Sequence, residues 1–556
     1  MVKAGAATLA LVGALMTGAV RAGQPTSGPA TIRGRVLVSR TGEALRGATV
    51  QATSIGRDPH VLLRATTDAQ GGFELLEVPP GPYRVSASRT GFVTRQLGQR
   101  GPFETADPIT VGPGQSIDAN FTLTPGGAIA GRILDANGDS ISGVRVQALR
   151  VQVVQGRRRL VPVGDERTTD DLGVYRVFGL PPGDYVVGAT IGPETMTITS
   201  DRSTSIFVNG ALVLSARAGH TSAYAPTYFP GTPVPADAHR ISVVAAEDQN
   251  NVDFWLIPSR LSRVAGTVRN QQGEPIQARI ELQPEVEGIR RSSLTTMSAT
   301  DGSFELNGVS PGAYYLNVLG RIVEDQPPDV AWVPLDVASE ELAGLTIITT
   351  TGSTVTGSVR IDGTPPANTG NLRIIAQPLG GRSGSGQMTA AVAADRFQLA
   401  NLIGPYGFVV DPLPAGYALK TIVANGRDVT DIAIEFRGGD HVDVQVEVTN
   451  RLAELYGTVR EDDQAVAQAS VLVFPDDAAR WTGSSRAIRT ARTDQNGGFA
   501  IRGLLPDRRY LAVALEYLND GDDQDAEFLA SMKARATVIP ASADVNRITD
   551  LMLVRR

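Results

Sequence analysis

The sequence offers few side chains that could carry out catalysis. Its four histidines are His60, His220, His239 and His441. A hydrolytic zinc site needs two His and one Glu, commonly with a His-x-x-Glu pair that places two ligands on one loop. The residues three positions after the histidines are Leu63, Ala223, Ser242 and Val444. No such pair exists, and we expect each histidine to lie on the surface or in a loop.

Motifs for nucleophilic and phosphate chemistry are missing as well. The chain has no Cys, which excludes disulfides, thiolate metal sites and Cys nucleophiles. A Ser-His-Asp triad scattered over distant segments is left open. The glycine-rich stretch 380–386 lacks the Lys and the helix of a phosphate loop, which favours a hairpin tip. We therefore expect no enzyme, no catalytic residue, no metal site and no cofactor.

Aromatic residues in loops are the remaining candidates, because a sugar ring can stack its apolar face on an exposed aromatic plane. The candidates for ligand stacking are Trp481, Tyr224, Tyr228 and Phe229. The alternatives are that segment 224–231 packs between neighbouring repeats and that Trp481 caps a sandwich edge. Trp255 and Trp332 are expected to pack in the interior.

The acidic run 519–527 could gather oxygen ligands for Ca²⁺, which prefers several carboxylates close together. Its spacing does not match the twelve-residue calcium loop. The alternative is a solvated loop, or the charged first turn of a short helix that continues to Lys533.

Length and composition bound the architecture. The chain has 556 residues, which suggests about four to five domains. It contains 60 Gly and 34 Pro but only 30 aromatic residues, a balance that favours many short strands joined by tight turns. The net charge is −7 and the basic residues are spread along the chain, so we expect no nucleic-acid partner.

The N-terminus has the pattern of a secretory signal peptide. Lys3 precedes an uncharged run from Ala4 to Val20, which ends in Val20-Arg21-Ala22. We expect a signal peptide over residues 1–22, a linker over 23–30, and no transmembrane helix in the mature chain. These features predict an exported protein that is periplasmic, on the cell surface or extracellular.

A repeat recurs five times along the chain. Its consensus is Gly-x-Val/Ile, a second apolar strand, Thr-Asp-x-x-Gly-x-Phe and Pro-Pro-Gly-x-Tyr. The leading glycines are Gly34, Gly131, Gly266, Gly357 and Gly457. The aromatic residues and tyrosines that follow are Phe73 and Tyr83, Tyr175 and Tyr185, Phe304 and Tyr314, Phe397 and Tyr406, and Phe499 and Tyr510. The aromatic-to-Tyr spacing is 9 to 11, whereas successive leading glycines are 91 to 135 residues apart, so fixed hairpins carry variable loops.

Each part of the consensus has a role in folding. Asp68 can accept hydrogen bonds from backbone N–H groups two residues on, while Gly71 takes a positive φ, which predicts a tight turn. Phe73 then points inward along an alternating strand. Tyr83 follows a Pro-Gly turn, where a buried tyrosine can bond its hydroxyl to the backbone, as at the corner of immunoglobulin-like sandwiches.

These motifs resemble the carboxypeptidase regulatory-like domain, a transthyretin-like β-sandwich related to the Cna B-type repeats and classed with carbohydrate-binding-like folds. The resemblance implies an accessory module without chemistry of its own. It predicts an all-β array of about five transthyretin/immunoglobulin-like antiparallel sandwiches. The expected sandwiches span 31–125, 128–258, 262–350, 352–449 and 453–556. Cna B-type repeats often carry a Lys to Asn/Asp crosslink, but only Lys420 and Lys533 follow the signal, which excludes that bond in the first three repeats.

The function expected from this resemblance is non-catalytic binding or scaffolding at the cell envelope, with carbohydrate as the first ligand class. A polysaccharide or an envelope protein is the expected partner. Two alternatives are an accessory subunit of a separate peptidase and a structural spacer that docks partners by strand addition at exposed sheet edges.

Overall fold

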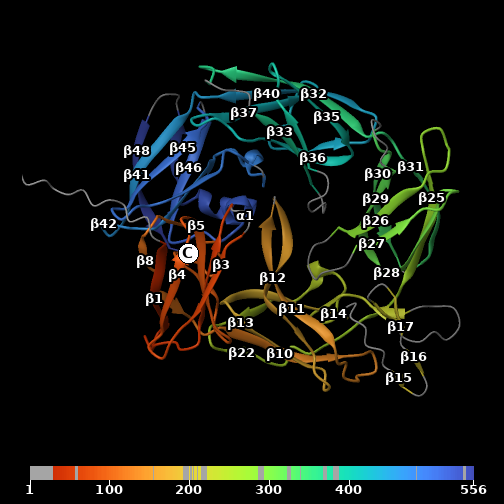
Figure 1. The fold of residues 1–556 in the computed structure, drawn as a ribbon, viewed down its shortest axis with the longest axis horizontal. Coiled ribbons are helices and arrows are strands. Elements are labelled where there is room, and N and C mark those ends of the chain that lie inside the picture. The colour runs from red at the N-terminus through yellow and green to blue at the C-terminus, as the bar shows by residue number, and fades with distance from the viewer. Residues whose placement is uncertain are drawn as a thin grey trace, which may run out of the picture. The chain divides into compact units, whose positions relative to one another are not determined.

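The protein was analysed as a computed structural model (Figure 1). The structure describes residues 29–56, 60–154, 156–191, 199–200, 203–204, 206–208, 211–213, 222–285, 293–321, 327–338, 340–366, 372–379, 387–483, 485–506, 508–541 and 546–555. The expected signal peptide, most of the linker, His220 and the 380–386 loop lie outside these residues. Among the described residues, no helix is both long enough and apolar enough to cross a membrane.

The chain divides into two compact units by its internal contacts. The first comprises Met1–Ser88, Arg95–Leu97 and Asp107–Thr122, and the second comprises Arg89–Thr94, Gly98–Ala106 and Leu123–Arg556. The nine strands from the first repeat are β1 (Ala30–Val38), β2 (Thr49–Ser54), β3 (Leu62–Thr66), β4 (Gly72–Val78), β5 (Gly81–Ser88), β6 (Arg95–Gln96), β7 (Ile109–Val111), β8 (Ser116–Asp118) and β9 (Phe121–Leu123). They form one sheet of order β4-β1-β8 with β9 on β1, and another of order β3-β2-β5-β6 with β7 on β5.

The second repeat has the same two-sheet plan. Its principal strands are β10 (Gly127–Leu134), β11 (Val144–Val154), β12 (Arg157–Thr168), β13 (Val174–Leu180), β14 (Gly183–Ile191), β20 (Thr227–Tyr228), β21 (Ile241–Val243), β22 (Asp248–Gln249) and β23 (Phe254–Trp255). One sheet is β13-β10-β22 with β23 on β10, and the other is β12-β11-β14-β20 with β21 on β14. Short additional strands are β15 (Thr199–Ser200), β16 (Ser203–Thr204), β17 (Ile206–Val208), β18 (Ala211–Val213), β19 (Ser222–Tyr224) and β24 (Pro258–Arg260).

The third and fourth repeats repeat this pairing. The third has β25 (Ser262–Arg269), β26 (Ala278–Pro284), β27 (Leu294–Met297), β28 (Ser303–Val309), β29 (Gly312–Gly320), β30 (Val330–Val337) and β31 (Leu342–Ile348). The fourth has β32 (Ser353–Asp362), β33 (Arg373–Pro378), β34 (Met388–Ala391), β35 (Arg396–Leu402), β36 (Gly404–Val410), β37 (Ala418–Ala424), β38 (Arg427–Asp428), β39 (Ile434–Phe436) and β40 (His441–Thr449). Their sheets are β28-β25-β31 with β27-β26-β29-β30, and β35-β32-β40-β37-β38 with β34-β33-β36-β39.

In the fifth repeat the strands join into a single eight-stranded sheet. They are β41 (Ala453–Glu461), β42 (Gln464–Ala465), β43 (Ser470–Pro475), β44 (Arg489–Arg492), β45 (Gly498–Leu504), β46 (Arg508–Leu515), β47 (Thr537–Ala541) and β48 (Asn546–Val554). The sheet is continuous because β48 pairs with both β41 and β46. Helix α1 (Ala526–Lys533) precedes β47, and the 3-10 turns among the described residues are η1 (Pro235–Asp237), η2 (Ala478–Arg480) and η3 (Asp522–Gln524). The all-β, multi-sandwich prediction is therefore confirmed.

The leading glycines allow the first strand of each repeat to lie against its last strand. These two strands run parallel in all five repeats, whereas the other neighbour of the first strand is antiparallel. A Cβ built on Gly131 would lie 2.1 Å from the carbonyl oxygen of Val252. The same construction at Gly34, Gly266, Gly357 and Gly457 places the Cβ 1.9, 2.2, 2.3 and 1.7 Å from a backbone oxygen of the last strand or the residue before it. Only glycine fits there without a shift of the backbone.

The predicted turns and corners are present. Asp68 accepts hydrogen bonds from the N–H groups of Gln70 and Gly72 at 2.9 and 2.7 Å, and Gly71 has φ 74°. The five corner tyrosines are all buried. Tyr185, Tyr314 and Tyr510 donate their hydroxyls to the carbonyl oxygens of Pro181, Ser310 and Leu505. Tyr83 differs, because its buried hydroxyl has no hydrogen-bond partner among the described residues.

Candidate functional site

The aromatic segment 224–231 belongs to the packed interior of the second repeat. Tyr228 is only 4% exposed and lies on β20, which pairs with β14. Phe229 and Tyr224 pack against the core, and the Phe229 ring meets the Phe254 ring edge to face at 6.1 Å. The expectation of an exposed stacking plane is wrong for Tyr228, which the pairing with β14 places in the sandwich, whereas Tyr224 and Phe229 are half-buried. Tyr224 instead lies on β19, which pairs with β24 in the connection between the second and third repeats.

Trp481 also packs, in agreement with the capping alternative. Its indole N–H donates to the carbonyl oxygen of Pro475 at 2.7 Å, and its ring meets Phe474 edge to face at 5.7 Å. It lies at the rim of a cluster that includes Leu529 and Met532 of α1. A ligand could reach only the part of this ring that the cluster leaves uncovered.

The other two tryptophans, Trp332 and Trp255, differ in how far they are buried. Trp332 stacks on Tyr315 with ring centroids 4.7 Å apart, as the packing expectation required. Trp255 is 49% exposed, so the expectation that it is a core residue was wrong. Its neighbours Phe254 and Leu256 are buried, and alternation along the strand turns Trp255 outward.

The remaining polar candidates are the histidines and the acidic run 519–527. His60, His239 and His441 are exposed. The acidic run forms η3 and the start of α1, where the Asp525 carboxylate accepts from the N–H of Glu527 at 3.0 Å and caps the helix. In the described part of the chain, no group of three or more His, Cys, Asp or Glu side chains is arranged to hold a metal ion. The helix start is the alternative given above to a calcium loop.

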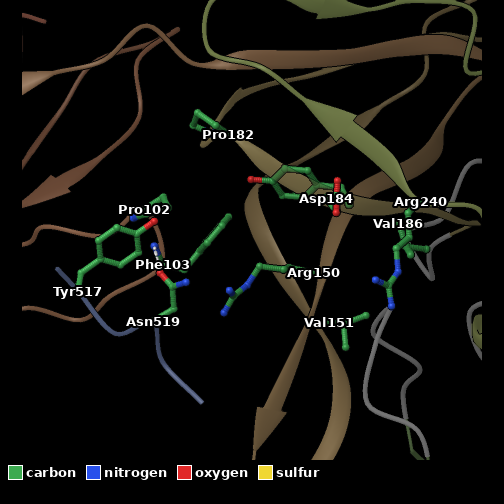
Figure 2. Close-up of a pocket in the computed structure, with 11 residues that line it drawn as sticks. Pro102, Phe103, Arg150, Val151, Pro182, Asp184, Val186, Arg240, Tyr517 and Asn519 are labelled. Atoms are coloured by element: carbon green, nitrogen blue, oxygen red, sulfur yellow. Dashed lines mark hydrogen bonds between the residues drawn. The ribbon is translucent and has the colours of Figure 1, made fainter. Parts of the chain in front are cut away.

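A surface pocket of about 330 Å³ is the best-formed candidate site, and all its lining residues belong to the second unit (Figure 2). Segment 98–106, β11 and β14 supply part of its wall. The rest comes from the turn before β14, the residue before β21 and the segment after β46. The lining residues are Pro102, Phe103, Arg150, Val151, Pro182, Asp184, Tyr185, Val186, Arg240, Tyr517 and Asn519.

One side of the pocket is fixed by hydrogen bonds and ring contacts. Phe103 donates its backbone N–H to the Asn519 Oδ1 at 3.3 Å, and its ring meets Tyr185 edge to face at 6.3 Å. The Arg150 guanidinium lies 4.1 Å from the centroid of the Phe103 ring and donates to the backbone oxygen of Asp520 at 3.4 Å. Burial raises the pKa of Tyr185, which keeps this corner tyrosine neutral. This side is therefore preorganised.

The other side of the pocket carries two charged side chains that have no partner among the described residues. Asp184 and Arg240 are exposed, and neither side chain forms a hydrogen bond or ion pair with another described residue. Figure 2 shows Arg240 beside Val186, whereas Tyr517, Asn519, Pro102 and Phe103 gather at the opposite side. The pocket thus combines apolar walls with a guanidinium, a carboxylate and an amide that can meet a polar ligand.

Sequence reasoning missed this pocket. Its residues come from positions as far apart as Pro102 and Asn519, and only Pro182, Asp184 and Tyr185 lie in a motif, the Pro-Pro-Gly-x-Tyr turn of the second repeat. Nothing in the repeat consensus indicated that segment 98–106 would lie against this motif.

Comparison with known proteins supports the first repeat directly. Residues 31–124 match the model of the carboxypeptidase regulatory-like domain, so the resemblance inferred from the repeat is confirmed there. The first sandwich is therefore a carboxypeptidase regulatory-like domain by this match. The search of curated proteins found no match to the chain.

Solved structures show only distant likeness. A streptococcal ancillary pilin is 15% identical with a TM-score of 0.22, over 57% of this chain and 98% of the pilin. The minor pilin GBS52 of Streptococcus agalactiae is 13% identical with a TM-score of 0.20, over 41% of this chain and 97% of its own. A candidate carbohydrate binding protein from Bacteroides uniformis is 10% identical with a TM-score of 0.14, over 56% and 100%. Scores this low carry no conclusion about this chain.

Proposed function

We propose that this protein is a non-catalytic, exported binding and scaffolding protein of the cell envelope, and that its ligand is a saccharide. The observation that carries the proposal is the pocket with Asp184 and Arg240 uncommitted opposite the fixed side formed by Phe103, Arg150 and Asn519. The residues of the repeat consensus, by contrast, serve turns, close strand approach and the core. Recognition is therefore assigned to the side chains of Asp184, at the variable position of the Pro-Pro-Gly-x-Tyr motif, and Arg240, while Pro182 and Tyr185 of the motif line the same pocket.

The chemistry of the pocket suits a sugar. Planar polar groups such as Asp, Asn and Arg pair with hydroxyls, while aromatic and proline faces cover the apolar face of a ring. The pocket volume of about 330 Å³ lies at the small end of ligand sites, which fits one or two sugar units better than a folded partner.

The test is a glycan-array and insoluble-polysaccharide pull-down on the mature chain from Gly23. The test variant is the double substitution Asp184→Ala and Arg240→Ala, because both side chains are exposed and their loss leaves the core intact. The matched control is Trp255→Ala, which removes an exposed aromatic ring on β23. Binding that is lost in the pocket variant and kept in the control supports the proposal.

Two other outcomes would redirect it. Loss of binding only in Trp255→Ala would move the saccharide site to the outer face of β23. Binding of no glycan by the parent chain would remove the saccharide proposal and favour a docking role. Edge strand β27, where Met297 is 62% exposed, would then be the first surface to test for strand addition. A peptidase assay with added Zn²⁺ tests the accessory-subunit alternative.

A further inference from the structure

We propose that the pocket selects saccharides that carry a carboxylate, such as uronic acids, through the Arg240 guanidinium. This inference rests on the proposed function and names the ligand class of the same site. The starting observation is the charge balance of the wall, which has two guanidinium groups, Arg150 and Arg240, against one carboxylate, Asp184.

The two arginines have different roles. Arg150 is held over the Phe103 ring and by the backbone oxygen of Asp520, so it supports the wall. Arg240 makes no hydrogen bond or ion pair within the described part of the chain, which leaves its planar group of donors available. A guanidinium binds a carboxylate through two parallel hydrogen bonds, a geometry that a neutral hydroxyl cannot reproduce.

The far side of the pocket suits the rest of an acidic sugar. A Cβ built on Gly101 would lie 2.4 Å from the Tyr517 ring, so glycine at this position is what lets the ring close on segment 98–106. The Asn519 Oδ1 is used by the N–H of Phe103, which leaves the amide N–H groups of Asn519 for a ligand oxygen. Arg240 stands at the other side (Figure 2), so a ligand that spans the pocket can meet both.

The charge of the whole chain makes this local arrangement informative. The net charge is −7, so an anionic polymer is not attracted by the protein as a whole. Binding of an acidic saccharide would therefore require specific cationic contacts, and these would weaken with added salt.

The experiment is isothermal titration calorimetry of the mature chain with oligosaccharides of galacturonate, glucuronate and mannuronate, each beside its carboxyl-reduced form. We expect at least one acid to bind about tenfold more tightly than its reduced form, as the loss of one charged hydrogen-bonded contact predicts. Arg240→Ala should remove this preference, and Arg240→Lys should restore part of it. Asp184→Asn should leave the preference for the acid intact, because it removes only the negative charge of the wall.

The outcomes separate the two proposals. If reduced and acidic forms bind equally, or if Arg240→Ala keeps the preference, the carboxylate inference is wrong while saccharide binding stands. If no glycan of any charge binds, the proposed function itself fails. Unchanged melting of each variant shows that a loss of binding comes from the pocket and not from unfolding.

Discussion

The corner tyrosines give a matched pair of side chains that differ in one hydrogen bond. The Tyr185 hydroxyl donates to Pro181 O at 2.6 Å, whereas the Tyr83 hydroxyl is buried without a partner among the described residues. Tyr185→Phe should lower the free energy of unfolding by about 1 kcal/mol, the usual net value of such a bond. Tyr83→Phe should be neutral or stabilising, because it removes an unsatisfied polar group. Thermal unfolding of both variants checks this, and an equal loss in the two would contradict it.

The need for glycine at the start of the fourth repeat can be tested by comparing Gly357 with Gly407, where a Cβ atom has space. Gly357→Ala would place a Cβ 2.3 Å from Val444 O, and the backbone must shift. We expect a loss of about 1–3 kcal/mol, as for other overpacked sites. In Gly407→Ala the nearest atom is Leu379 Cδ1 at 3.8 Å, so this control should cost far less. Calorimetric unfolding of the full chain measures both variants. Similar losses of stability in the two would show that the close approach of the strands at Gly357 does not require glycine.

For single residues, the sequence predicts the role of a side chain when that role depends on neighbours nearby in the chain. The turn at Asp68 and the corner at Tyr185 depend on neighbours within a few residues, so their spacing was enough. Trp255 was misassigned because its apolar character outweighed the alternation that places Phe254 inside and its neighbour outside. Arg240 carries no local signal, since its importance depends on pocket residues that are distant in the sequence, from Pro102 to Asn519.

Among the strands, an ion-pair group on the outer face of the third repeat gives a pH-dependent prediction. Arg263 on β25 pairs with Glu305 on β28 at 2.8 Å and with Glu341 just before β31. The hydrogen bond from Arg263, followed by that from Asn307, lowers the pKa of Glu305 to about 2. A lowered pKa in the folded state contributes stability that is present above the unfolded value of about 4.3. This contribution is lost as the pH falls from there toward 2.

Glu305→Gln should therefore flatten the acid limb of the unfolding curve of this repeat. The effect should be small, because the group is exposed and solvent screens it. Asp336→Asn is the control, since that exposed carboxylate has no ion-pair partner in the described part of the chain. Chemical denaturation between pH 2 and 6 is the measurement. A curve for Glu305→Gln that matches the parent would show that the pair does not contribute.

The elements themselves were largely predictable, and the exceptions have physical causes. The alternating runs and Gly turns predicted the sandwich strands, as for β4, where the alternation is interrupted at Glu77, which has φ 56°. The parallel pairing of the first and last strands was not foreseen, since sequence alternation does not show strand direction. The helix after the acidic run was foreseen only as an alternative.

Across the molecule, segment 98–106 is held in the second unit by a buried carboxylate. Glu104 is 6% exposed and accepts from the N–H groups of Arg100 and Gly101 at 2.7 and 2.9 Å, and it pairs with Arg492 on β44. Glu104→Gln should weaken this network, because a buried charge partner of Arg492 is removed.

We expect amide exchange at Arg100 and Gly101 to rise by roughly tenfold or more, in line with the loss of a charged hydrogen bond. Hydrogen–deuterium exchange of the full chain measures it. Asp237→Asn on the exposed turn η1 is the control and should leave this segment protected. Unchanged exchange in Glu104→Gln would mean that the segment is held by other contacts, and the pocket wall at Phe103 would not depend on Glu104.

The fixed inner spacing predicts five repeats, but no spacing predicts the contacts between distant segments. Glu104 and Arg492 lie 388 positions apart and share no periodic pattern. The division into five sandwiches at the expected boundaries stays a prediction, which limited proteolysis at residues 126–127, 259–261, 351 and 450–452 would examine.

The pairing of the first with the last strand of each repeat also bears on how the chain folds during synthesis. Arg33 and Asp118 meet across 85 positions, and Thr458 and Asp550 meet across 92. At ribosomal rates a first strand waits roughly 5 to 20 s for its last strand to emerge. Contacts this distant along the chain slow folding, and one edge of the first strand stays unpaired meanwhile. Each emerging repeat would therefore remain open for seconds, the state in which a chaperone can hold it and an export channel can accept it.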